Sequence, residues 1–348
     1  MIQKLRRLTA VWILLLVYSP VFAADAHDER SVIDVVGKVS NHDYFELPLG
    51  NKLYLPRIFL AGGDWYFFTS TKMAVESGQF LDSEAGLVRT DGAAISLDMS
   101  ITSHLIYVWF GFILTFIITY WAARRYKRGI GTKTEPRGAW QNIFEVVFVF
   151  IRDDIAKEFI PASKYKKFVP YLFTIFMAIA FMNLFGLLPW AAAATANLTV
   201  TATLAIITFV ITQVNGTKDH WEHVFMFPGV PGWSRFILTP VEFLGLFTKP
   251  FALAIRLFAN MLSGKIMIVS ILGLIFIFTD LFGAAIGVGS SIFWVLLTAA
   301  LYFLKVLVAL IQAYVFTLLS AVFIGMASEE HYHEHDETSV AQVQDVQL

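Results

Sequence analysis

Five long apolar segments occupy the chain beyond residue 100, and polar connections separate them. They cover residues 105–123, 168–188, 198–214, 240–278 and 290–327. Each of the first three is close to the roughly 20 residues that a helix needs to cross a bilayer. The pattern predicts an all-α polytopic membrane protein with about five transmembrane helices, whose membrane domain covers residues 101–328.

The last two apolar segments are too long for one ordinary crossing. At about 1.5 Å per residue each would extend roughly 57 Å, against a hydrocarbon core of about 30 Å. Ordinary tilts of up to about 40° cannot absorb that excess. We therefore expect two long, strongly tilted helices that lie obliquely, bend or project from the membrane. Pro250 offers one bend in the first of them.

The N-terminal residues have the pattern of an export signal. Lys4, Arg6 and Arg7 precede an apolar stretch, and small residues near Ala23 suit a cleavage site. This pattern predicts a signal peptide over residues 1–23, and a retained membrane anchor is the alternative.

Residues 24–100 are polar and contain no predicted span. Residues 52–60 and 64–70 are rich in aromatic and branched side chains and are bounded by glycines, which predicts short strands. If the signal is exported, this small region lies outside the cytoplasm.

Composition supports a membrane protein and excludes several other classes. The chain is 57% apolar and only 15% charged, below the roughly 25% that is usual for soluble domains. It has no cysteine, which excludes disulfides, thiolate metal sites and cysteine nucleophiles. The net charge of −1 and the lack of a basic stripe give no reason to expect nucleic-acid binding.

The distribution of lysine and arginine predicts the topology. The connection between the first two apolar segments carries eleven of them, whereas residues 190–197 and 279–289 carry none. The positive-inside rule places the basic connection in the cytoplasm, so that the mature N-terminus lies outside and the tail, residues 329–348, lies inside. Within that connection, residues 140–159 are expected to form a helix along the membrane surface.

A polar stripe runs along the fourth apolar segment. Glu242, Lys249 and Arg256 recur every seven residues, and Asn260 and Ser263 fall on the same side. An arginine at the bilayer centre costs about 2.5–3.5 kcal/mol on insertion scales, so its presence indicates a function. The alternative for Arg256 is a side chain that extends to the interface, and for Glu242 and Lys249 an interfacial anchor.

Polar residues also interrupt the second and fifth segments. Lys305 and Gln312 lie seven residues apart and therefore on one face, which suggests an ion path opposite the first stripe. A buried glutamine alone is often a residue that joins helices. Asn183 is a further candidate, and a hydrogen bond at a helix end is its alternative role.

Three motifs together resemble one known family. The run RLFANMLSGK, which begins at Arg256, is similar to the signature of subunit a of the rotary F-type ATP synthase. The stretch Gln312-Ala313-Tyr314 together with the ending GMASEEH resembles the last helix of that subunit, and the run FMNLFGLLP resembles its earlier asparagine-containing span. The three motifs occur along this chain in the order of the family. The resemblance covers roughly residues 98–332.

The resemblance implies a proton-translocating stator in a bacterial inner membrane. Subunit a lies beside a rotating ring of c subunits, each with one essential carboxylate, and provides two half-channels that reach the ring from opposite sides. Subunit b of the peripheral stalk and the rest of ATP synthase are the other implied partners. No cofactor and no metal are implied. The chain has no phosphate-binding loop motif, so it is not expected to be an enzyme on its own.

Individual residues take their expected roles from the family. Arg256 matches the arginine that faces the ring, Gln312 the glutamine packed near it, and Glu242 a carboxylate of the cytoplasmic half-channel. The chain departs from the family at Lys265, where carboxylate or histidine is common, and at Lys305, where some members carry histidine. Our hypothesis is that these lysines lie close together in the outer half-channel and relay protons, and the alternative is that water alone conducts.

Two groups of histidines are considered as metal sites, and neither is interpreted as one. His331, His333 and His335 fall in an acidic tail, which favours a solvated segment over a metal site. The sequence from His220 to His223 has the spacing of neither common zinc-protease motif, and we expect it to form a loop.

The main rival function is a self-contained secondary transporter that uses Arg256 and Glu242 to bind its substrate. Many transporters show an internal repeat, and this chain does not. An intramembrane hydrolase is less favoured still, because no nucleophile–base pair falls within an apolar segment.

Overall fold

A computed structural model describes residues 44–46, 52–83, 86–90, 95–129, 138–188, 190–225 and 232–329. The chain divides into two compact units, residues 1–100 and 101–348, which are described separately. The predicted signal peptide and the histidines of the tail lie outside the described residues.

The N-terminal unit contains short antiparallel sheets. Its three-stranded sheet has the order β4–β3–β7, formed by β4 (Asp64–Phe68), β3 (Arg57–Ala61) and β7 (Ile95–Asp98). The smaller sheets pair β1 (Tyr44–Glu46) with β2 (Lys52–Tyr54), and β5 (Phe80–Ser83) with β6 (Gly86–Arg89). One helix, α3 (Thr71–Glu76), packs against the larger sheet.

Both predicted strand regions form strands, with one interruption. The stretch 52–60 divides into β2 and β3 around Leu55 and Pro56, since proline cannot donate a hydrogen bond to a sheet. The tight turn from β3 to β4 uses Gly62 and Gly63, both with positive φ, a conformation that favours glycine. Phe59, Ala61, Ala74 and Phe80 form the buried core beneath the sheet.

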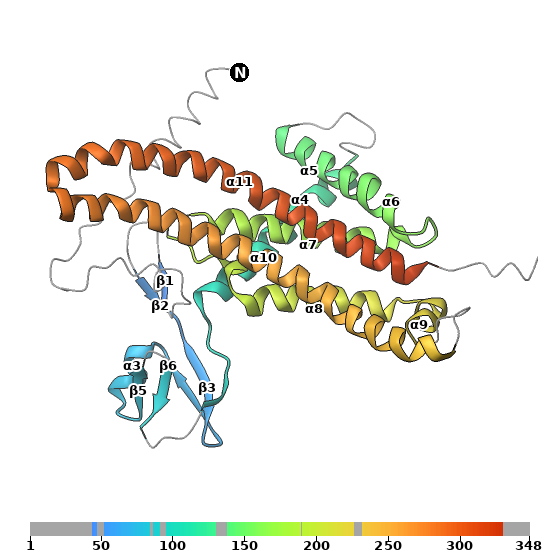
Figure 1. The fold of residues 1–348 in the computed structure, drawn as a ribbon, viewed down its shortest axis with the longest axis horizontal. Helices are drawn as coiled ribbons and strands as arrows, with labels where there is room; N and C mark the ends of the chain where they lie inside the picture. Colours follow the sequence, from blue (N-terminus) through green and yellow to red (C-terminus); the bar gives the residue numbers. More distant parts are fainter. Residues whose placement is uncertain are drawn as a thin grey trace, which may run out of the picture. The chain divides into compact units, whose positions relative to one another are not determined.

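The second unit is a set of long helices (Figure 1). They are α4 (Ser103–Lys127), α7 (Tyr165–Gly186), α8 (Leu198–Val214), α10 (Gly232–Phe282) and α11 (Ala284–Ser328). Each matches one predicted apolar segment, which confirms the all-α membrane fold. Helices α4, α7, α10 and α11 are each long and apolar enough to cross a membrane. Helix α8 meets that test only together with α9 (Lys218–Phe225), from which it is bent by 105°.

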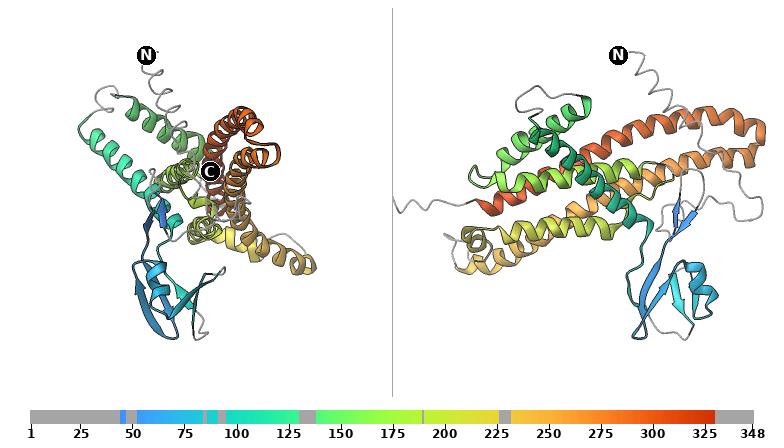
Figure 2. Two further views of the ribbon diagram at one scale, coloured as in Figure 1. Left: turned by 90° about the vertical axis from the view of Figure 1, so that its left-hand side faces the viewer. Right: turned by 180° about the vertical axis from the view of Figure 1, so that it is seen from behind.

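Helices α10 and α11 form a long antiparallel hairpin that turns at Gly283 (Figures 1 and 2). They contain 51 and 45 residues, more than the apolar segments predicted, because each continues beyond its apolar stretch. At 1.5 Å per residue α10 is about 77 Å long, so the expectation of helices that exceed the bilayer is strengthened. The helix continues through Pro240 and Pro250 without interruption, and the suggested bend at Pro250 stays a prediction.

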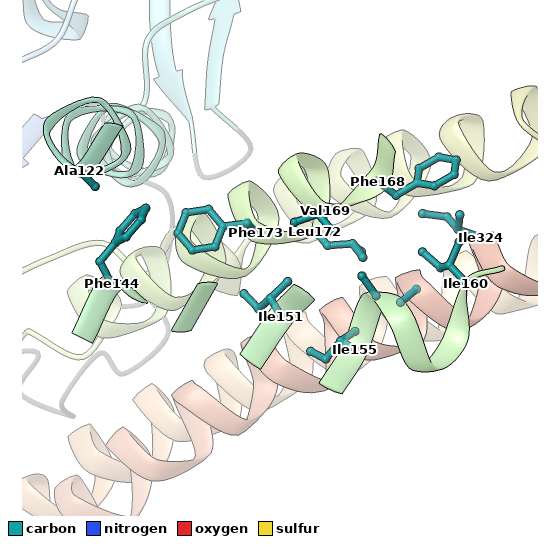
Figure 3. Close-up of a cluster of buried hydrophobic side chains, with 12 residues drawn as sticks. Ala122, Phe144, Ile151, Ile155, Ile160, Phe168, Val169, Leu172, Phe173 and Ile324 are labelled. Carbon is teal, nitrogen blue, oxygen red and sulfur yellow. The ribbon is translucent and has the colours of Figure 1, made fainter. Parts of the chain in front are cut away.

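The segment predicted as a surface helix is helical throughout. It consists of α5 (Ala139–Phe150), a π-helical turn (Ile151–Ala156) and α6 (Lys157–Phe159). Its apolar side packs into a cluster with Phe168 and Leu172 of α7 and Ile324 of α11 (Figure 3). This cluster joins the basic connection to the helices, and the position of the segment at a membrane surface stays a prediction.

Candidate functional site

The polar stripe of α10 meets α11 through an amide pair. Asn260 Nδ2 donates to Gln312 Oε1 at 2.7 Å, and Gln312 is only 4% exposed. Ala309 and Ala313 beside Gln312 are buried, and such small side chains let two helices approach closely. The structure therefore joins two of the candidate residues, which come from different helices.

Arg256 lies one helical turn before this amide pair, on the exposed side of α10. Ala252, Ala259 and Ser263 lie on the same face and are also exposed, whereas Leu253 and Leu257 are buried against neighbouring helices. Within the part of the chain that the structure describes, Arg256 makes no hydrogen bond or ion pair. We call Arg256 and these three small residues the arginine face. It presents one positive charge on a surface that another helix can approach closely.

Asn183 is fully buried at the end of α7. Its Nδ2 donates to the carbonyl oxygen of Ala309 at 3.1 Å, and Thr195 Oγ1 donates to its Oδ1 at 2.7 Å. Both polar groups of the side chain are thus used to hold α7, α11 and the turn Ala194–Ala196 together. This geometry suits the alternative role of a helix-end hydrogen bond.

A cavity of about 260 Å³ lies where α8, α9, α10 and the end of α11 meet. Glu242 and Lys249 of α10 line it, and so do polar residues from the other elements: Thr208, Thr212, Gln213, Asp219, His220, Glu222, His223 and Glu329. We call it the α9 cavity. Lys249 is seven residues from Arg256, or about 10 Å along the helix axis, so the stripe leads from this cavity to the arginine face.

Helix α9 supplies most of the titratable side chains that line the cavity. The expectation that His220–His223 form a loop is wrong, since they lie within α9. The sharp bend after α8 directs α9 back toward α10. There His220 Nε2 lies 3.3 Å from Gln213 Oε1 and interacts electrostatically with Lys249 and Glu242.

Thr217 fixes the C-terminal end of α11 beside this cavity. Its backbone nitrogen donates to the carbonyl oxygen of Ala327, and its Oγ1 donates to that of Glu329, each at 2.9 Å. Sequence reasoning did not identify Thr217 or the α9 residues as part of this site. Their contacts with α10 and α11 depend on the bend between α8 and α9, which the sequence pattern does not reveal.

The two lysines, Lys265 of α10 and Lys305 of α11, lie on the other side of Arg256 from the cavity. Lys265 Nζ donates to the carbonyl oxygen of Ala191, in the connection between α7 and α8. Lys305 of α11 packs over Gly264, where a Cβ atom would lie 2.9 Å from its Nζ. The structure thus brings Lys305 next to Gly264, the residue that precedes Lys265. We call Lys265 and Lys305 the lysine pair.

Tyr302 adds a third polar side chain near the lysine pair. Its hydroxyl donates to the carbonyl oxygen of Leu187, in the same α7–α8 connection that Lys265 contacts. Tyr302 precedes Lys305 by three residues and so lies on the same face of α11. The spacing of three residues from Lys305 is a sequence signal that points to Tyr302.

Comparisons with known proteins agree with the resemblance found in the sequence. The family model described as ATP synthase A chain matches residues 105–325. The chain is 44% identical over 239 residues to ATP synthase subunit a of Chloroherpeton thalassium, covering 68% of this chain and 69% of that protein. It is 43% identical over 252 residues to ATP synthase subunit a of Myxococcus xanthus, covering 69% of this chain and 79% of that protein.

Proposed function

Because the chain belongs to the ATP synthase A chain family, we propose that it is the proton-translocating stator of ATP synthase. It is a multi-pass membrane protein and a component of that complex, and we assign no ATP site to it. The observation that carries the proposal is the arginine face. Arg256 has no hydrogen bond or ion pair among the described residues, and Ala252, Ala259 and Ser263 beside it are small. Such a charge suits a moving carboxylate that has to come close.

We assign the partner of the arginine face to the ring of c subunits. A unit charge about 4 Å from a carboxylate contributes roughly 4 kcal/mol at an effective dielectric constant of about 20, or about three pKa units. Burial raises a carboxyl pKa by up to about 3–5 units. The arginine therefore offsets most of the effect of burial, so that each ring carboxylate loses its proton as it passes Arg256.

The buried amide pair positions this charge. Gln312 and Asn260 fix the contact between α10 and α11 one turn from Arg256, so the backbone that carries the arginine is held firmly. The fixed positive charge of an arginine also opposes direct proton flow past the ring. Protons must then travel on the ring from one side to the other.

The two polar regions on either side of Arg256 are assigned to the two half-channels. The α9 cavity, with Glu242 and Lys249, forms the cytoplasmic one, and the lysine pair with Tyr302 lies in the outer one. The basic connection supports this orientation, because α7 then runs outward and α8 inward to the cavity. The mature N-terminus then lies outside and the tail inside the cytoplasm. Subunit b is the proposed neighbour in the stator.

ATP-driven acidification of inverted membrane vesicles tests the function. With Arg256→Ala we expect acidification to be lost while ATP hydrolysis by the assembled complex is still detected. Arg124→Ala, which removes an exposed arginine at the end of α4, serves as the matched control and should pump normally. Unchanged acidification in Arg256→Ala would reject the stator mechanism and favour the transporter.

A further inference from the structure

The three-stranded sheet of the N-terminal unit has apolar side chains on both faces. Directly paired residues of neighbouring strands project to the same side. Phe59, Tyr66 and Phe68 project to one side and pack with Phe80 in the core. A sheet of this kind normally presents polar residues on the opposite face. Here that face is apolar as well.

Strand register defines the members of the open face. Ile58 pairs with Phe67, and Leu60 pairs with both Trp65 and Leu97. Trp65 is 50% exposed and Phe67 is 69% exposed, and their rings stack with centroids 6.5 Å apart. Leu97 and Met99 continue the exposed apolar surface along β7 and its extension. We call these six residues the open sheet face.

An exposed apolar face of this size indicates an interaction surface. The short connection from β7 to α4 limits what it can contact. Strand β7 ends at Asp98 and the first membrane helix begins at Ser103. Five residue steps span at most about 18 Å, so the end of the sheet stays within that distance of the point where α4 enters the bilayer. Tryptophan and other aromatic side chains gather at the membrane–water interface, where their rings lie at headgroup level.

We propose that the open sheet face docks on the lipid surface beside α4, with Trp65 and Phe67 inserted at headgroup level. The N-terminal unit then lies flat on the membrane instead of extending into the aqueous compartment. This unit falls outside the matched family region, so the proposal is independent of the proton path. Its failure would leave the stator function untouched.

The absence of native cysteine permits a clean test by site-directed spin labelling. Phe67→Cys places a nitroxide on the open sheet face. Lys72→Cys places the same label on α3, on the core side of the sheet, and is the matched control. Each variant is assembled into ATP synthase and reconstituted in vesicles of phosphatidylethanolamine and phosphatidylglycerol. Retained ATP-driven pumping verifies assembly of the membrane unit. Phe67 is largely exposed, so its replacement leaves the core of the N-terminal unit intact.

Collision with oxygen, which concentrates in lipid, is compared with collision with a water-soluble nickel chelate present on both sides of the bilayer. We expect the label at position 67 to collide mainly with oxygen and the label at position 72 mainly with nickel. Free collision with nickel at position 67 would overturn the proposal, since the face would lie in water. Shielding from both reagents would also overturn it, since protein would then cover the face.

Discussion

The α9 cavity and the lysine pair lie on opposite sides of Arg256 along the hairpin of α10 and α11, but they are built differently. The cavity is an open space of about 260 Å³ lined by carboxylates, histidines and Lys249. In the lysine pair, Lys265 is bonded to a backbone carbonyl and Lys305 is packed over a glycine. Titratable groups around a cavity suit protons carried by water, whereas proton transfer at the lysine pair would depend on where each lysine side chain is held.

The first test of this difference between the α9 cavity and the lysine pair is at Glu242, where we expect the largest effect of the two regions on ATP-driven pumping. Glu242→Gln keeps the size of the side chain and removes the group that can bind and release a proton in the cavity. We expect ATP-driven pumping to fall roughly tenfold, which corresponds to about 1.4 kcal/mol in the rate-limiting barrier. Glu222→Gln, on α9 at the same cavity, is the control and should retain most of the rate. Equal losses in both variants would show that cavity charge, and not Glu242 itself, sets the rate.

The lysine pair provides the next largest effect. Lys265→Met and Lys305→Met remove the charge with little change of length, and we expect each to slow pumping several-fold if the lysines relay protons. The assay is acidification of inverted vesicles at fixed ATP hydrolysis. Undiminished pumping in both variants would reject the relay and leave water as the conductor.

A smaller effect is expected from packing at Gly264. Gly264→Ala places a methyl group 2.9 Å from Lys305 Nζ, so the lysine must move. Overpacking of this kind costs about 1–3 kcal/mol when side chains cannot shift, and less for the flexible end of a lysine. We expect a modest loss of pumping that is relieved in the double variant with Lys305→Met. No relief would mean that Gly264 acts through backbone contacts instead.

The smallest effect is expected at His220. His220→Gln keeps a polar partner for Gln213 at the cavity, so pumping should change by less than about twofold, or roughly 0.4 kcal/mol. The measurement is the initial rate of acidification. A loss as large as that of Glu242→Gln would make the histidine an essential part of the path.

The two regions also differ in how far sequence could predict them. The stripe of Glu242, Lys249, Arg256 and Asn260 was predicted from helical periodicity, and the five helices from hydropathy. The amide pair depends on how α10 and α11 are aligned, and the bonds to Ala191 and Leu187 depend on which loops meet which helices. A single sequence does not specify those contacts.

Misassigned segments have the same cause. His220–His223 were expected in a loop because charged residues and nearby glycine and proline interrupt the apolar pattern. The residues form α9, whose position follows from the 105° bend after α8. The lengths of α10 and α11 were underestimated because hydropathy reports the apolar part of a helix and not its polar ends.

The central claim is that Arg256 separates the α9 cavity from the lysine pair. Its most direct test is passive proton flux into vesicles that contain intact ATP synthase, with no nucleotide present and an imposed membrane potential. With the rotor idle, native vesicles should stay proton-tight, and Arg256→Ala vesicles should leak because a protonated ring carboxylate can then reach both sides. An Arg256→Ala complex as tight as the native one would contradict the claim.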